Sequence, residues 1–196
     1  SYPKDFLRSF PHAQLDVVEI DPEITQLARK YFKLADNPRL TVYHQDGRVF
    51  LNTSMTKYDT AILDAYLDDL TIPFQLTTVE AVKRIYDSLN DGGVIIINII
   101  DGGELKFLRA EITTYKAIFP QVFLFPVSYP DDIHRPQNFA LIALKSKEKP
   151  KFESGDDELN GYLGHLWNED LPLDMPILTD NYAPVEQYLI GLQNTR

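Results

Sequence analysis

The chain has 196 residues, 44% of them hydrophobic, with no cysteine and a formal net charge of −10 at pH 7. This length is enough for one α/β domain with its own hydrophobic core. The acidic balance argues against a nucleic-acid backbone as partner, because phosphate binding needs clustered Lys and Arg. A cationic small molecule would suit the charge, although ordinary acidic solubility explains it as simply.

No stretch of the sequence has the features of a membrane span or an export signal. The longest apolar run, 94–100, has the size of a buried strand, and the first residues lack a charged segment followed by an apolar one. The absence of cysteine excludes disulfides and thiolate metal sites. The histidines show no metal-ligand spacing either. We therefore expect a cytoplasmic protein without a metal.

The first part of the chain predicts alternating strands and helices. A short apolar strand ends at Glu19, and a helix over 22–33 follows, capped by Asp21 and opened by a proline. A strand over 40–43 and a turn at 45–47 come next. One apolar stripe runs along the helix: Ile24, Leu27, Ala28, Tyr31 and Phe32.

The following part continues this alternation. The predicted elements are a strand over 58–63, a helix over 77–89, a strand over 94–100, a helix over 104–119, and strands over 121–127 and 139–144. Thr77 and Glu80 form a capping box for the first of these helices, and Asp91-Gly92-Gly93 ends it. The last two strands are joined too closely for a helical crossover, so they should be antiparallel.

This alternation predicts an α/β fold with a mostly parallel sheet, covered by helices on both faces. We expect one domain over 1–145. The less periodic segment 146–196 should pack on the same domain as a C-terminal extension.

Acidic residues follow four successive predicted strands. They are Glu19 and Asp21, then Asp46 before Gly47, then Asp64 with Asp68 and Asp69, and finally Asp101. Ligands of open parallel sheets bind beyond the carboxyl ends of the strands, and an acid after the second strand of a nucleotide-binding unit holds ribose hydroxyls. Each acid has a simpler explanation as a cap or a turn residue. Together they predict an acidic crevice that binds a nucleoside-containing ligand.

Three segments carry a family resemblance. Val-Val-Glu-Ile-Asp-Pro-Glu-Ile at 17–24, His-Gln-Asp-Gly-Arg at 44–48 and Tyr-Asp-Thr-Ala-Ile-Leu-Asp at 58–64 resemble spermidine synthase. That family is the aminopropyltransferase branch of the S-adenosylmethionine-dependent methyltransferase fold, which is Rossmann-like. The tail Leu-Thr-Asp-Asn-Tyr-Ala-Pro-Val-Glu at 178–186 is similar to bacterial spermidine-synthase-like proteins, some of them fused to membrane segments.

The resemblance implies roles for several of these residues. Glu19, with Ile20 beside it, would bind the ribose of decarboxylated S-adenosylmethionine. Asp46 and Gly47 would meet its adenine. Asp64 would accept the proton of the attacking amine, as a carboxylate within hydrogen-bond reach can.

The resemblance also places the second substrate, a diamine such as putrescine. Its other ammonium would lie against Asp68 and Asp69, with Tyr182 over the site. The family suggests a homodimer, and no metal is needed because methylthioadenosine is already a good leaving group.

Two departures from the family pattern matter. The family's Asp-Ser-Ser-Asp-Pro run reads Asp-Ala-Tyr-Leu-Asp-Asp at 64–69, so Leu67 occupies the place of the second acid. The family's first strand and glycine-rich loop are absent ahead of Ser1. We expect the parent protein to carry that loop and this chain alone to be inactive.

Two other functions stay open. A methyltransferase on the same fold would use intact S-adenosylmethionine, and the altered run after Asp64 is compatible with it. A non-catalytic domain of the same fold would bind a partner instead.

Overall fold

The computed structural model describes residues 2–66 and 72–193. The chain forms two compact parts, which we call the N-terminal part, residues 1–54, and the C-terminal part, residues 55–196. Each is described by itself. Among the helices that the structure describes, none combines the length and the apolar character that crossing a bilayer requires.

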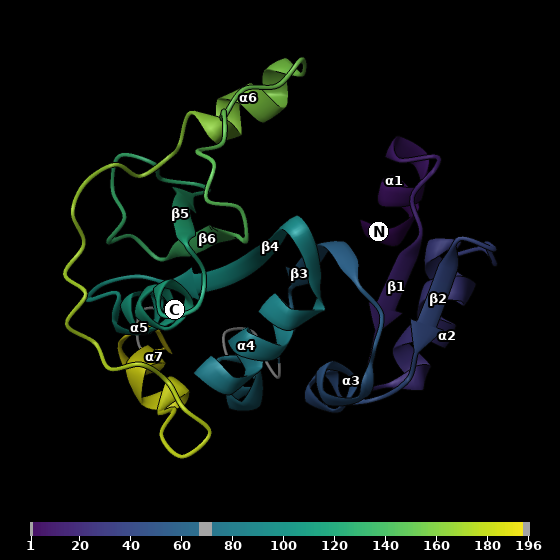
Figure 1. The fold of residues 1–196 in the computed structure, drawn as a ribbon, viewed down its shortest axis with the longest axis horizontal. Helices are drawn as coiled ribbons and strands as arrows, with labels where there is room; N and C mark the ends of the chain where they lie inside the picture. Colours follow the sequence, from purple (N-terminus) through teal and green to yellow (C-terminus); the bar gives the residue numbers. More distant parts are fainter. Residues whose placement is uncertain (1, 67–71, 194–196) are drawn as a thin grey trace. The chain divides into compact units, whose positions relative to one another are not determined.

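The N-terminal part contains a parallel pair of strands. Its elements are α1 (Tyr2–Ser9), β1 (Leu15–Val18), α2 (Pro22–Phe32), β2 (Leu40–Tyr43) and α3 (Gly47–Thr53) (Figure 1). Val17 of β1 lies opposite Val42 of β2. The Asp21 carboxylate accepts a hydrogen bond from the backbone N–H of Glu23 at 2.8 Å, which confirms the predicted N-cap of α2.

Two features of this part differ from the prediction. Residues 45–47 were expected to form only a turn, but Asp46 instead caps α3 by accepting from the backbone N–H of Val49. The apolar stripe of α2 is largely exposed, and Thr25 is the one buried residue of that helix. An amphipathic pattern predicts a helix, but it does not show what covers the apolar face.

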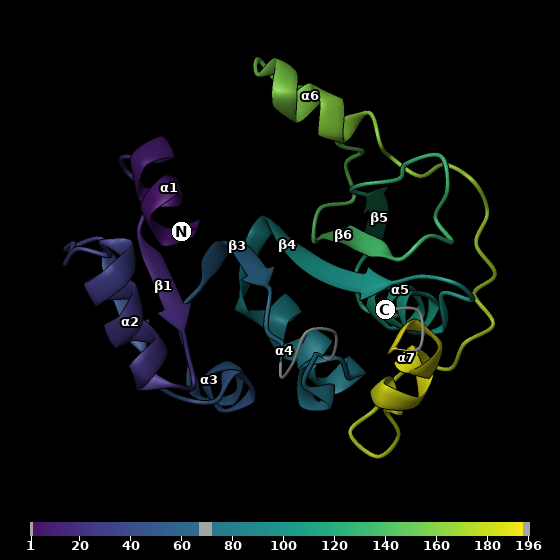
Figure 2. The ribbon, with the colours of Figure 1, turned by 180° about the vertical axis from the view of Figure 1, so that it is seen from behind.

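The C-terminal part is built on a four-stranded sheet in the order β3-β4-β6-β5. Its elements are β3 (Tyr58–Leu63), the 3-10 helix η1 (Phe74–Leu76), α4 (Val79–Ser88), β4 (Leu89–Asp101), α5 (Lys106–Lys116), β5 (Gln121–Pro126), β6 (Gln137–Leu144), α6 (Asp157–Leu163) and α7 (Val185–Gln193) (Figures 1 and 2). β3 and β4 are parallel, whereas β6 is antiparallel to both β4 and β5. The predicted antiparallel last pair is confirmed.

The start of α4 corrects the predicted capping box. The Thr77 hydroxyl donates to the backbone oxygen of Phe74, and the Thr77 backbone is in the αR region at the end of η1, whereas an N-cap residue is extended. Thr78 is the N-cap, and its hydroxyl accepts from the backbone N–H of Ala81. Glu80 accepts from the backbone N–H of Asp180 instead of closing the box. The helix therefore begins two residues later than predicted.

β4 begins earlier than predicted. Leu89 already pairs with Tyr58, and the register then jumps so that Thr60 pairs with Val94. The intervening residues, 91–93, form an irregularity in which Gly92 has a φ of 76°, a value that favours glycine. The predicted helix stop is thus a bulge inside the strand.

The helices of this part pack on one face of its sheet. Ile95, Ile97 and Ile99 of β4 are buried on the face next to α4 and α5. The alternating residues, such as Ile96 and Asn98, are only half-buried because they point to the other face. The prediction of helices on both faces concerns the sheet as a whole and stays a prediction.

Candidate functional site

The N-terminal part brings two predicted ligand-binding acids to one edge of its sheet. Glu19 follows β1 and Asp46 follows β2, and the backbone N–H of Glu19 still donates to Tyr43 at 2.9 Å. Glu19 Oε1 accepts from the backbone N–H of Asp21 at 2.9 Å, and Asp46 Oδ1 accepts from Val49 at 3.0 Å. Both carboxylates are half-buried and held by the turn that follows their strand.

Ile20 and Gly47 flank these acids. The Ile20 side chain is 68% exposed, and Gly47 is the first residue of α3. An exposed apolar side chain next to two fixed acceptors can lie against a flat, polar-edged ligand.

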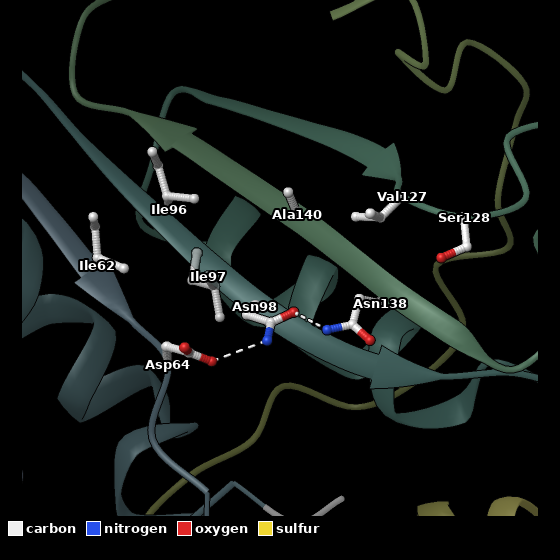
Figure 3. A pocket seen from close by; sticks show the side chains of 9 residues that line it. All are labelled: Ile62, Asp64, Ile96, Ile97, Asn98, Val127, Ser128, Asn138 and Ala140. Carbon is white, nitrogen blue, oxygen red and sulfur yellow. Dashed lines mark hydrogen bonds between the residues drawn. The ribbon is translucent and has the colours of Figure 1, made fainter. Parts of the chain in front are cut away.

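The C-terminal part places Asp64 at the carboxyl end of β3. Leu63 lies opposite Ile97, so the next residues, Asp64 and Asn98, face each other across the strands. Asn98 Nδ2 donates to Asp64 Oδ1 at 2.9 Å, and Asn138 Nδ2 donates to Asn98 Oδ1 at 3.0 Å (Figure 3). Asp64 is exposed, and its carboxylate is hydrogen-bonded to a short chain of two side-chain amides, those of Asn98 and Asn138.

An open depression of about 330 Å³ surrounds this chain of hydrogen bonds. Figure 3 shows Asp64, Asn98 and Asn138 together along its lower margin, with apolar side chains above them. The lining residues are Ile62, Asp64, Ile96, Ile97, Asn98, Val127, Ser128, Asn138 and Ala140. One carboxylate beside an apolar wall suits a ligand that combines an amine with an aliphatic chain.

Tyr66 attaches the segment after Asp64 to the same strand. Its hydroxyl donates to the backbone oxygen of Asn98 at 2.7 Å. Burial raises the pKa of Tyr66 above its ordinary value, and the charge of Asp64 raises it further. Tyr66 is thus a hydrogen-bond donor here, not a base.

Asp101 does not join the exposed acids at the sheet edge. It lies on the opposite face of β4 from Asn98 and is 2% exposed. Its Oδ1 accepts from the backbone N–H of Gly102 and its Oδ2 from that of Leu108, both at 2.7 Å. Burial raises the pKa of Asp101 to about 6, while hydrogen bonds from Leu108, Gly102 and Phe107 oppose the rise. Asp101 is a buried cap of α5, and its inclusion in an open acidic crevice is wrong.

The other predicted substrate-binding residues share no described contact with this chain of amides, or lie outside the described residues. Tyr182 is 54% exposed and pairs with Thr179 through the backbone. Its neighbour Tyr188 has a pKa raised to about 12 by burial and by a hydrogen bond with Tyr182. Among the described contacts, none joins Tyr182 to Asp64. Asp68 and Asp69 lie outside the residues that the structure describes.

Sequence reasoning did not single out Asn98, Asn138 or Tyr66. A signal was present, because Asn98 interrupts an otherwise apolar strand at a position two residues from Ile96 and Ile100. In the parts of the chain that the structure describes, no three His, Asp or Glu side chains gather as a metal site would require.

Comparisons with known proteins establish the family. Residues 7–123 match the spermine/spermidine synthase domain, and the chain belongs to that family. It is 30% identical to a "probable polyamine aminopropyl transferase" of Bifidobacterium longum, over 95% of this chain and 46% of that protein. It is also 31% identical to an N-terminal histidine N-methyltransferase of Emericella nidulans, over 68% of this chain and 25% of that protein.

A solved structure supports the fold. The crystal structure of a "probable spermidine synthase" from Corynebacterium glutamicum matches with a TM-score of 0.69 and 23% identity, covering 88% of this chain and 59% of that one. The fold is therefore the Rossmann-like fold of this family. The chain spans 46% of the Bifidobacterium longum relative and thus about half of its length.

Proposed function

We propose that this chain is the catalytic segment of an aminopropyltransferase that moves an aminopropyl group from decarboxylated S-adenosylmethionine to a diamine such as putrescine. Family membership and similarity to a polyamine aminopropyl transferase support the reaction class. The observation that carries the proposal is Asp64, an exposed carboxylate at the carboxyl end of a parallel strand, beside an open apolar depression.

The reaction needs one base and one cationic donor. The amine nitrogen attacks the methylene next to the sulfonium, a C–N bond forms as the C–S bond breaks, and methylthioadenosine leaves. Only the neutral amine is nucleophilic, so the group next to it must accept a proton. Asp64 is the residue we assign to that role, with one oxygen bonded to Asn98.

The donor would be held by the N-terminal part. Glu19 would accept from the ribose hydroxyls, next to Ile20, and Asp46 with Gly47 would meet the adenine. Both carboxylates fit this role because turn and cap hydrogen bonds already fix their orientation. The donor's sulfonium is a positive charge, which the chain's net charge of −10 favours.

The second ammonium of the diamine is assigned to Asp68 and Asp69, with Tyr182 nearby. An ammonium held at a distance from the attacking nitrogen lets the protein select a diamine by length. This assignment rests on the family resemblance and on the acidic sequence after Asp64.

Methyl transfer is the second candidate. The similarity to an N-terminal histidine N-methyltransferase favours it, because that protein is 31% identical over 68% of this chain. Intact S-adenosylmethionine would then replace the decarboxylated donor.

Calorimetric titration would decide between these functions. Methylthioadenosine and S-adenosylmethionine are titrated into protein made from the complete reading frame, with and without putrescine. Tight methylthioadenosine binding that strengthens with putrescine is expected. When decarboxylated S-adenosylmethionine and putrescine are supplied together in a separate assay, mass spectrometry should detect spermidine. A preference for S-adenosylmethionine without a putrescine effect would replace the proposal by methyl transfer, and binding of neither would favour a non-catalytic domain.

A further inference from the structure

We infer that Asn98 is the positioning residue for Asp64, and that Asn138 orients Asn98 for this task. The inference rests on the proposed function, since it concerns how the assigned base is held. Two observations support it. Hydrogen bonds join Asp64 to Asn98 and Asn98 to Asn138, and Asn98 points to the face of β4 opposite the buried isoleucines.

The direction of the Asn98 amide is set by its two neighbours, Asp64 and Asn138. Asn138 Nδ2 donates to Asn98 Oδ1 at 3.0 Å, so the oxygen of that amide faces β6. Its Nδ2 then faces β3 and donates to Asp64 Oδ1 at 2.9 Å. If the Asn98 amide were reversed, two oxygens would meet at Asp64 and two amide nitrogens would meet at Asn138, so both neighbours favour the observed direction.

Asn98 holds Asp64 from a rigid position. It lies within β4, between its neighbours β3 and β6, where Ala140 is its partner across the antiparallel pair. Its backbone oxygen also accepts from the Tyr66 hydroxyl at 2.7 Å. Asp64 is thus fixed through Leu63 in the sheet on one side and through Tyr66 on the other.

The hydrogen bond from Asn98 distinguishes the two carboxylate oxygens of Asp64. Oδ1 receives the Asn98 amide, so a proton taken from an amine would go to the other oxygen, Oδ2. Hydrogen bonds to charged groups are stronger than neutral ones, and side chains on strands are held more accurately than those on loops. Asn98 therefore acts through Asp64 and need not touch the substrate.

The sequence contains a matched control. Asn90 Nδ2 donates to Asp59 Oδ1 at 2.8 Å, an equivalent Asn–Asp pair on the same two strands. This pair lies near the first residues of β3 and β4, at the opposite ends of the strands from Asp64. Asn90→Leu removes the same kind of hydrogen bond without touching the candidate site.

The first test compares variants in protein made from the complete reading frame. Asn98→Leu should lower kcat about tenfold while the KM for the donor stays within twofold. Asn98→Asp should lower kcat further, because it sets a second carboxylate against Asp64. Asn90→Leu should leave kcat unchanged. A purely structural role for Asn98 predicts the reverse order, with the isosteric Asn98→Asp the milder change.

The second test needs no activity. The side-chain amide resonances of Asn98 should shift in Asp64→Ala and stay in place in Asp59→Ala, which should instead shift those of Asn90. Unchanged Asn98 resonances in Asp64→Ala, or an Asn98→Leu variant with full kcat, would overturn the inference. If Asp64→Asn itself retains turnover, the proposed function fails at Asp64, and the amide resonances still decide whether Asn98 holds that carboxylate.

Discussion

Replacing Asp101 with Asn should change how stability depends on pH. Burial raises the pKa of Asp101 from an ordinary value of 3.8 to about 6 in the folded protein. One pKa unit is worth 1.36 kcal/mol, so ionising this group costs the folded state about 3 kcal/mol relative to the unfolded chain. This cost arises because a buried carboxylate serves as the cap, with its two oxygens accepting from the backbone N–H groups of Gly102 and Leu108.

The sign follows from the order of the two pKa values. Below about pH 4 the group is protonated in both states and no cost arises. Between about pH 4 and 6 the unfolded chain loses its proton first, so the free energy of unfolding falls as the pH rises. Above about pH 6 both states are ionised and the cost of about 3 kcal/mol stays constant.

Asp101→Asn removes this titration but also removes one acceptor, because an amide nitrogen must then face a backbone N–H. That loss costs about 1–3 kcal/mol at every pH. The variant should therefore be less stable than the natural protein by about 1–3 kcal/mol at pH 4. At pH 7 it should be equally stable or up to about 2 kcal/mol more stable, because the natural protein then carries the cost of about 3 kcal/mol.

Urea unfolding at several pH values, followed by circular dichroism, measures this difference directly. The control is Asp131→Asn, which makes the same substitution at an exposed residue of the loop between β5 and β6. A difference between Asp101→Asn and the natural protein that stays constant from pH 4 to 7 would refute the reasoning.

The remaining predictions concern other named groups. Both carboxyl oxygens of Glu111 are buried without a hydrogen-bond partner among the described residues, and burial raises its pKa well above the usual range, so Glu111→Met should stabilise the protein by about 1–3 kcal/mol in urea unfolding. Thr78→Ala should cost about 1 kcal/mol through loss of the α4 cap, and more than Thr77→Ala in the same assay. Asp64→Asn should abolish turnover with donor affinity nearly intact, and an equal loss of both would make Asp64 structural. Glu19→Gln should weaken the donor in calorimetry; unchanged affinity would contradict the ribose assignment.

The local features of the fold could be predicted from the sequence where neighbouring residues decide them. Asp21 followed by proline marked the start of α2, and the short connection between β5 and β6 required an antiparallel pair. Both depend on a few adjacent residues. The predicted cap of α4 was wrong because the choice between Thr77 and Thr78 depends on where the preceding 3-10 turn ends. Thr77 still has the αR backbone of that turn, and Thr78 is the first extended residue after it.

The candidate site was predictable in part. Asp64 was found because it ends an apolar strand, and strand ends of parallel sheets are where ligands bind. Asn98 and Asn138 were missed because their contact joins residues forty positions apart in the sequence. Such a contact requires the pairing register of β4 with β6, which depends on how whole strands pack.

Asp64 and Asp101 show why position along the sequence was an incomplete guide. Both acids lie where an apolar strand ends, on neighbouring parallel strands, so sequence reasoning treated them alike. Side chains alternate between the two faces of a strand, and the observed register pairs Ile62 with Ile96. Two residues further along each strand, Asp64 lies beside Asn98 on the same open face as Ile62 and Ile96. Asp101 is an odd number of residues from Ile96, so it lies on the other face, under α5. The bulge at 91–93 hides this register in the sequence, because it shifts β4 against β3. The face that an acid occupies, more than its place at the strand end, decides whether it can meet a ligand or must cap a helix.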